Sequence, residues 1–128
     1  MAYRIVCVED NPQNMRLVRK ILCSAGHEVI EAVDGNSGYE AIVEHMPNLV
    51  LMDVNLPDID GLQVTMHVKD QPELAHIPIV ALTANAMHGD RERCFEAGCD
   101  GYIPKPITKS ELLNTVAHFL TQSEYKQV

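Results

Sequence analysis

Short apolar segments alternate along this chain with segments of helical periodicity, and this alternation limits the possible folds more than any other feature. The segments 5–8 and 49–52 are apolar at successive positions, a pattern that indicates strands covered on both faces. Strand–helix alternation with short connections predicts a parallel sheet with helices on both faces. We therefore predict an α/β fold with a doubly wound, five-stranded parallel sheet. The strands are expected at 4–9, 27–32, 48–52, 78–82 and 99–103.

Capping residues mark where several of the helices begin. Asn11 offers an N-cap and Pro12 follows at the first helical position. Asn36 is expected to cap a second helix that continues through Met46. The third and fourth helices are expected at 61–70 and 90–97. The run Thr108–Glu111 has the pattern of a capping box and predicts the start of a final helix.

Length and charge exclude several classes of protein. A chain of 128 residues fits one domain, which we place at 1–122, followed by a short C-terminal tail at 123–128 and no output domain. The net charge of −8, without a basic patch, argues against direct binding to nucleic acid. The apolar runs are too short to span a membrane, and the N-terminus does not resemble a secretory signal. The four cysteines form no C-x-x-C pair and are expected to be reduced, in a cytoplasmic protein.

Polar residues follow four of the predicted strands. Glu9 and Asp10 end the first strand, Asp53 ends the third, Thr83 ends the fourth, and Lys105 follows the fifth. Because the carboxyl ends of parallel strands lie at one edge of a sheet, these groups should converge there. Converging carboxylates repel one another, and Mg²⁺ is a natural counter-ion because it prefers carboxylate and phosphate oxygens. An Asp carboxylate in such a site can act as a nucleophile and form an aspartyl phosphate.

Each of these residues also has an ordinary structural explanation. A single Asp at a strand end is usually a turn or cap residue, and Glu9–Asp10 could simply favour the positive end of the following helix. Thr83 alone could be a cap, and Lys105 alone a solvated surface charge. The four features together, in this order along the chain, favour the functional interpretation.

The motifs at these positions resemble the receiver domain of bacterial response regulators. The matching segments are Val8–Asn11, Leu51–Pro57 with Asp60–Gly61, Ala81–Ala84 and Tyr102–Pro106. The resemblance extends from Arg4 to Leu120 and is nearest to single-domain, cell-cycle-type regulators and to the receivers of hybrid histidine kinases. It implies the flavodoxin-like strand order 2-1-3-4-5.

The resemblance also implies a role for each matched residue. Asp53 would accept a phosphoryl group, and Thr83 and Lys105 would bind the phosphoryl oxygens. Mg²⁺ would be held by the side chains of Asp10 and Asp53, by the backbone carbonyl of Asn55, and by Glu9 through water. Many members of the family have Asp where this chain has Glu9, so the metal geometry could differ in detail. The Lys105–Pro106 peptide would be cis, and Tyr102 would move with Thr83 as a switch.

A phosphoacceptor signalling switch is the function that the resemblance implies. The donor would be the phosphohistidine of a histidine kinase or a histidine phosphotransfer protein, and the output would pass to a downstream protein target, with no nucleic acid or membrane involved. Phosphorylation and dephosphorylation would be self-catalysed, so the protein would not be an enzyme in the usual sense. The main alternative is a receiver fragment of a hybrid kinase that relays phosphate to a phosphotransfer protein.

Two functions from other classes are disfavoured. An aspartyl-nucleophile phosphatase of the haloacid-dehalogenase type needs a second Asp two residues after the nucleophile, and Asn55 occupies that position. A flavodoxin-like FMN carrier would need a loop after the first strand that accepts phosphate, and here that loop is acidic. Catalytic turnover of phosphomonoesters would identify the first, and a yellow colour the second.

Overall fold

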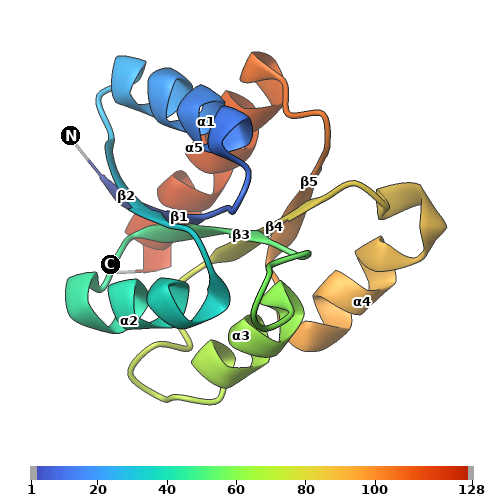
Figure 1. Cartoon of the computed structure of the whole chain (residues 1–128). Helices are drawn as coiled ribbons and strands as arrows, with labels where there is room; N and C mark the ends of the chain where they lie inside the picture. The colour runs from blue at the N-terminus through green and yellow to red at the C-terminus, as the bar shows by residue number, and fades with distance from the viewer. Residues whose placement is uncertain (1–2, 127–128) are drawn as a thin grey trace.

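The computed structural model describes residues 3–126, and the side chains of residues 3–121. Strands and helices alternate along the chain, and a short 3₁₀ helix, η1, precedes α4 (Figure 1). The elements are β1 (Arg4–Val8), α1 (Pro12–Ser24), β2 (Glu28–Ala32), α2 (Gly35–His45), β3 (Leu49–Asp53), α3 (Gly61–Lys69), β4 (Ile79–Thr83), η1 (Ala86–His88), α4 (Asp90–Ala97), β5 (Gly101–Pro104) and α5 (Lys109–Lys126).

The sheet has five parallel strands in the order β2-β1-β3-β4-β5, which confirms the predicted fold class and strand order. Helices α1 and α5 cover one face, and α2, α3 and α4 cover the other (Figure 1). The order reverses at β1, because β2 lies on one side of it and β3 on the other. In sheets of this kind, ligands bind outside the carboxyl ends of the strands at such a reversal.

The two hydrophobic cores follow from the side-chain alternation along the central strands. Every residue of β3 and β4 is buried, as expected for strands covered by helices on both faces. Val50 and Met52 face α2, α3 and α4, whereas Leu49 and Leu51 face α1 and α5. The central strands are therefore packed on both faces, and this packing positions the residues at their ends.

Two helix starts illustrate how local sequence sets the structure. The Asn11 side chain accepts hydrogen bonds from the N–H groups of the second and third residues beyond it, and Pro12 is the first helical residue, as predicted. The predicted cap of α2 at Asn36 is wrong, since Asp34 caps that helix. The Asp34 carboxylate accepts the N–H of Ser37 at 2.8 Å, and the Ser37 hydroxyl accepts the N–H of Asp34 at 3.3 Å. This reciprocal pair satisfies donors that Asn36, already inside the helix, cannot reach.

Several other element ends differ from the prediction by one residue, and two differ by more. β5 begins at Gly101 rather than at Cys99, because the N–H of Cys99 bonds to the carbonyl of Cys94 at the end of α4. Helix α5 continues to Lys126, so residues 123–126, which were expected to form a tail, are helical. Residues 127 and 128 lie outside the described part of the chain. Between residues 3 and 126, no helix combines the length and the apolar character that crossing a membrane requires.

Candidate functional site

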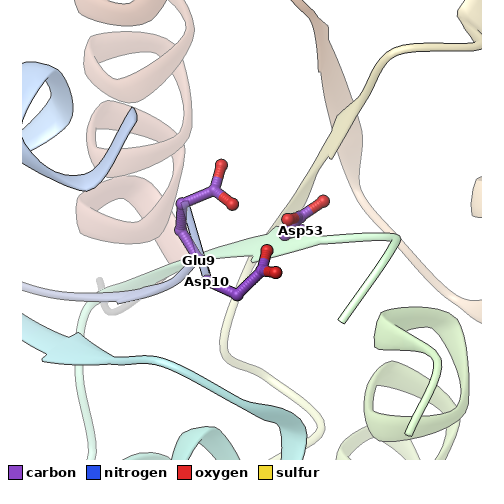
Figure 2. A group of neighbouring side chains, drawn as sticks. All are labelled: Glu9, Asp10 and Asp53. Atoms are coloured by element: carbon purple, nitrogen blue, oxygen red, sulfur yellow. The ribbon is translucent and has the colours of Figure 1, made fainter. Parts of the chain in front are cut away.

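Three carboxylates meet where β1 and β3 end. One oxygen from each of Glu9, Asp10 and Asp53 lies within 4.8 Å of the others (Figure 2). Register explains the meeting, because β1 and β3 are neighbours and Val8 pairs with Met52, immediately before the acidic residues. Glu9 and Asp53 are only 1% and 2% exposed, whereas Asp10 faces solvent. The predicted convergence of these three residues is therefore present in the structure.

The Lys105 ammonium lies between the two buried carboxylates. Its Nζ is 3.0 Å from Oε1 of Glu9 and 3.2 Å from Oδ1 of Asp53. The backbone N–H of Lys105 donates to the carbonyl of Thr83 at 2.8 Å, and the Lys105–Pro106 peptide is cis, as expected. One positive charge thus faces two buried negative charges, with the Asp10 carboxylate beside them.

Burial and mutual repulsion set the protonation of this group. Burial raises the pKa of Asp53 to about 7, and the neighbouring Glu9 carboxylate contributes to the rise. Burial opposes ionisation of Glu9 as well, but its contacts with Asp53 and Lys105 outweigh burial and lower the pKa of Glu9. Burial likewise disfavours the charged form of Lys105, but its contacts with the two carboxylates outweigh this and raise its pKa. The site therefore carries excess negative charge once Asp53 ionises.

Backbone groups hold the two buried carboxylates in place. The N–H of Asn55 donates to Oδ1 of Asp53 at 3.1 Å, and the N–H of Asn11 donates to Oε2 of Glu9 at 3.3 Å. The chain also closes tightly behind Asp53, because a methyl group on Gly61 would overlap the Asp53 carbonyl oxygen. Glycine at this position lets the loop after β3 return directly against the backbone of Asp53.

The donor set suits a hard divalent cation. All three ligand candidates are carboxylate oxygens, and Mg²⁺ prefers one or two such groups together with water and phosphate oxygens. Oε1 of Glu9 is buried and receives no well-directed hydrogen bond from the described residues, although the Lys105 ammonium is nearby. Because Asp53 shares this ammonium, negative charge stays uncompensated, and that charge fits a cation, bound directly or through water.

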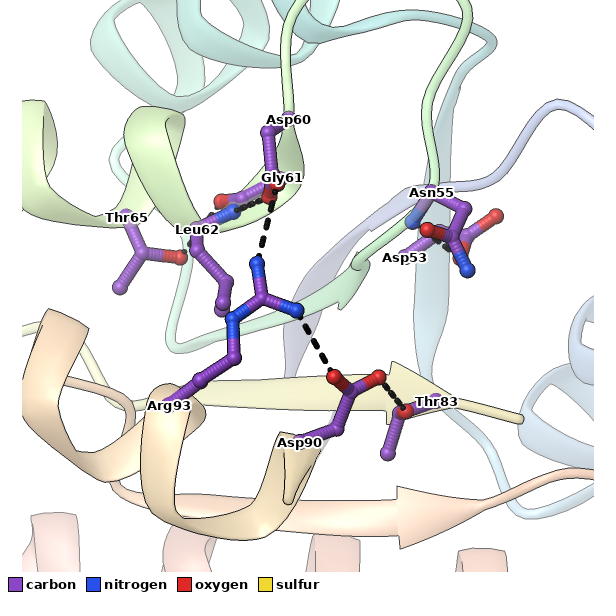
Figure 3. A network of polar contacts seen from close by, with 9 residues as sticks. All are labelled: Asp53, Asn55, Asp60, Gly61, Leu62, Thr65, Thr83, Asp90 and Arg93. Carbon is purple, nitrogen blue, oxygen red and sulfur yellow. Dashed lines mark hydrogen bonds and ion pairs between the residues drawn. The ribbon is translucent and has the colours of Figure 1, made fainter. Parts of the chain in front are cut away.

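Thr83 lies at the end of β4, next to the Asp53 strand, and its hydroxyl has partners outside the cluster of Glu9, Asp10 and Asp53. The hydroxyl donates to Oδ2 of Asp90 at 2.7 Å (Figure 3). It also accepts the N–H of Asn85 at 3.0 Å. Sequence reasoning identified Thr83 but missed Asp90, which it treated only as the start of a helix. An acidic residue at the first position of α4 was the available signal, but it is typical of any helix N-terminus.

Tyr102 does not contribute to the carboxylate cluster. Its half-buried ring meets Phe95 edge-on at 6.2 Å between centroids, and the Arg91 guanidinium lies over it at 5.8 Å. Both neighbours belong to α4, whereas Tyr102 belongs to β5. The ring therefore connects α4 to β5. Tyr102 pairs with Ala81 of β4, two residues before Thr83.

Comparison with known proteins gives a consistent result. A family model of the response regulator receiver domain matches residues 5–117. The polar-differentiation response regulator DivK of Brucella anthropi is 42% identical over 120 residues, which cover 94% of this chain and 98% of that protein.

Solved structures agree with the family match. The receiver domain of a sensor histidine kinase from Pseudomonas aeruginosa, with a magnesium ion coordinated in its active site cleft, is 35% identical with a TM-score of 0.88, over 94% of this chain and 99% of that chain. The signal receiver domain of a histidine kinase from Syntrophus aciditrophicus is 29% identical with a TM-score of 0.87, over 94% of this chain and 91% of that chain. The sequence match, the fold and the placement of the acidic cluster agree, and the chain belongs to the response regulator receiver domain family.

Proposed function

We propose that Asp53 accepts a phosphoryl group from the phosphohistidine of a partner protein. The observation that carries this proposal is the Lys105 ammonium, 3.2 Å from the Asp53 carboxylate, in a site where Glu9 and Asp10 supply further negative charge. Lysine in this position can neutralise an incoming phosphoryl oxygen, and the acidic neighbours can hold a cation. A structural ion pair alone does not require a cluster of three carboxylates, of which only two contact the ammonium.

The transfer forms one bond and breaks one. A carboxylate oxygen of Asp53 attacks phosphorus, the P–N bond of the phosphohistidine breaks, and the imidazole nitrogen keeps the electron pair and takes up a proton. Attack by water on the acyl phosphate later returns the Asp53 carboxylate and inorganic phosphate. Catalysis of both steps is positioning and charge stabilisation, which makes the chain a self-catalysed switch rather than an enzyme with turnover.

The residues of the site divide the remaining work. Mg²⁺, when bound, would supply positive charge that stabilises the phosphoryl oxygens next to Asp53. Asp10, Asp53 and the backbone carbonyl of Asn55 would hold this ion, with Glu9 acting through water. Lys105 binds one phosphoryl oxygen. The Thr83 hydroxyl binds another after it turns from its present partner. The Pseudomonas relative, whose site holds magnesium, supports this assignment.

The output of the switch is a protein contact. Tyr102 and Phe95 line a shallow groove with His118 and Phe119, on the face formed by α4, β5 and α5. Movement of Thr83 would change the packing of Tyr102 and so alter this groove. The net charge of −8 disfavours nucleic acid as the partner. The partners are therefore a histidine kinase or histidine phosphotransfer protein on the input side and a protein target on the output side.

A relay from a hybrid kinase is the second candidate. Two of the similar structures are receiver domains of histidine kinases, and this similarity supports the relay as a candidate function. A receiver in a relay passes its phosphoryl group back to a histidine of a phosphotransfer protein, with the same Asp53 chemistry. The relay predicts that the phosphorylated chain transfers its phosphoryl label to a phosphotransfer protein faster than it loses the label by hydrolysis. A terminal regulator would lose the label mainly by hydrolysis.

Intact-mass measurement after treatment with acetyl phosphate and Mg²⁺ tests the proposal. The wild-type chain should gain the mass of one phosphoryl group, and Asp53→Asn should gain none while keeping its circular dichroism spectrum. Asp70→Asn, a change of an exposed acidic residue at the end of α3, is the matched control and should be labelled like the wild type. Equal labelling of Asp53→Asn would refute the assignment, and turnover of phosphomonoesters would indicate a phosphatase instead.

A further inference from the structure

The Thr83 hydroxyl is already engaged before any phosphoryl group arrives. A hydroxyl has a single proton to donate, and Thr83 gives it to the Asp90 carboxylate at 2.7 Å (Figure 3). Thr83 is fully buried and Asp90 is 6% exposed, so water does not compete for this bond. The bond must break before the same hydroxyl can donate to a phosphoryl oxygen on Asp53.

The second carboxylate oxygen of Asp90 contacts the guanidinium of Arg93. Nη1 of Arg93 lies 2.8 Å from Oδ1 of Asp90, and Nη2 of the same guanidinium lies 3.4 Å from Oδ2 of Asp60. Asp60 caps α3 by accepting the N–H of Leu62 at 2.8 Å. The carboxylate of Asp90 is therefore fixed in position by a chain of contacts that reaches from β4 through α4 to the start of α3 (Figure 3).

The segment between the two bonded residues is short, and its other hydrogen bonds are local: the Asn85 carbonyl accepts the N–H groups of His88 and Asp90, and the Asn85 N–H donates to the Thr83 hydroxyl. Residues 84–89 connect β4 to α4, and their only regular structure is the η1 turn. Gly89, which precedes α4, provides no side-chain cap, and Met87 in η1 is 94% exposed. The Thr83–Asp90 hydrogen bond closes this loop from inside the protein. Breaking it removes the side-chain bond between the first turn of α4 and the end of β4.

We propose that Asp90 is a positioning residue that latches Thr83 in the unphosphorylated orientation, an inference that rests on the proposed function of Asp53. Phosphorylation pulls the Thr83 hydroxyl from Asp90 towards the phosphoryl group, and Asp90 keeps only its contact with Arg93. The first turn of α4 then loses its side-chain bond to the sheet, and the change is transmitted through Arg93 to the cap of α3. The latch opposes activation because its hydrogen bond is lost in the active state.

Beryllofluoride, an analogue of the phosphoryl group, measures this opposition directly. Its affinity for the chain with Mg²⁺ can be followed by ¹H–¹⁵N NMR titration at constant ionic strength. Asp90→Ala removes the acceptor, so beryllofluoride should bind about tenfold more tightly, which corresponds to about 1.4 kcal/mol and to the lower end of the range for a hydrogen bond to a charged group. In a Thr83→Val background the same Asp90→Ala change should have no effect, because the hydroxyl that it releases is absent.

Two comparisons separate the latch from simpler effects. Glu92→Gln removes an exposed negative charge from the same helical turn and should leave the affinity within about twofold of the wild type. Tighter binding that persists in the Thr83→Val background would reduce the role of Asp90 to electrostatics and overturn the latch. An affinity of folded Asp90→Ala for beryllofluoride that equals or falls below that of the wild type would also overturn the latch. If Asp90→Ala does not fold, Asp90→Asn keeps the size of the side chain with a weaker acceptor and should still tighten binding by about threefold; no tightening would overturn the latch.

Failure of the proposed function would look different. If wild type does not bind beryllofluoride, or if Asp53→Asn binds it equally well, the phosphoacceptor assignment falls and the latch with it. If wild type binds, Asp53→Asn does not, and the Asp90 variants behave as wild type, only the latch falls. The γ-methyl chemical shift of Thr83 gives a further readout without beryllofluoride: it should move in Asp90→Ala and not in Glu92→Gln, and an unmoved signal would contradict the release of the hydroxyl.

Discussion

Removal of the Asp10 carboxylate should stabilise the metal-free protein. Asp10 is the exposed member of the acidic cluster, and its oxygen lies within 4.8 Å of those of Glu9 and Asp53. At pH 8, above the pKa of about 7 for Asp53, two buried carboxylates face one Lys105 ammonium. One negative charge is then left uncompensated beside Asp10. Asp10→Asn removes the repulsion and keeps the shape of the side chain.

The structure sets the size of the effect. Two unit charges 4.8 Å apart repel by about 0.9 kcal/mol at the dielectric constant of water, which is the relevant medium for an exposed side chain. Salt at about 0.1 M lowers this value, and the buried position of the other two carboxylates raises it. We expect Asp10→Asn to raise the free energy of unfolding by about 1 kcal/mol in the absence of divalent cations.

Urea denaturation followed by circular dichroism, at pH 8 with EDTA, measures this difference. Glu73→Gln removes an exposed charge outside the cluster of Glu9, Asp10 and Asp53 and is the control for net charge. It should change the free energy of unfolding by less than about 0.5 kcal/mol. Added Mg²⁺ should then stabilise the wild type more than Asp10→Asn, because the variant has lost a ligand. A variant that is less stable than wild type in EDTA, or that gains as much from Mg²⁺, would refute the account of carboxylate crowding.

Three further predictions follow from single contacts. Gly61→Ala should destabilise the protein by at least about 3 kcal/mol in urea denaturation, because its methyl group overlaps the Asp53 carbonyl oxygen; a loss below about 1 kcal/mol would contradict this close approach. Lys105→Met should cost about 2 kcal/mol at pH 8 and less near pH 5, where Asp53 takes up a proton; a pH-independent cost would contradict the ion contacts. The hydrogen bond from the N–H of Gly35 is the main cause that lowers the pKa of Asp58. The free energy of unfolding of the wild type should therefore exceed that of Asp58→Asn above about pH 4, and this difference should disappear as pH falls through the lowered folded-state pKa. A difference that does not change between pH 5 and pH 2 would refute this account.

The sequence determined the fold class and most of the candidate site, because both depend on short-range patterns. Runs that are apolar at successive positions require strands covered on both faces, and alternation with helices then requires a parallel sheet. Once the sheet is parallel, residues that directly follow strands must share one edge. This rule alone places Glu9, Asp10 and Asp53 together. The strand order followed from the family resemblance.

Tertiary structure decided the features that depend on contacts between distant segments or on competing local partners. Asp34 and Asn36 are both good caps by type, and only the fit of Ser37 against Asp34 selected the first. Nothing in the sequence around Asp90 distinguishes it from an ordinary acidic residue at a helix start. Its bond to Thr83 exists because the segment after β4 folds back and brings α4 against the strand end, where burial shields the hydrogen bond from water.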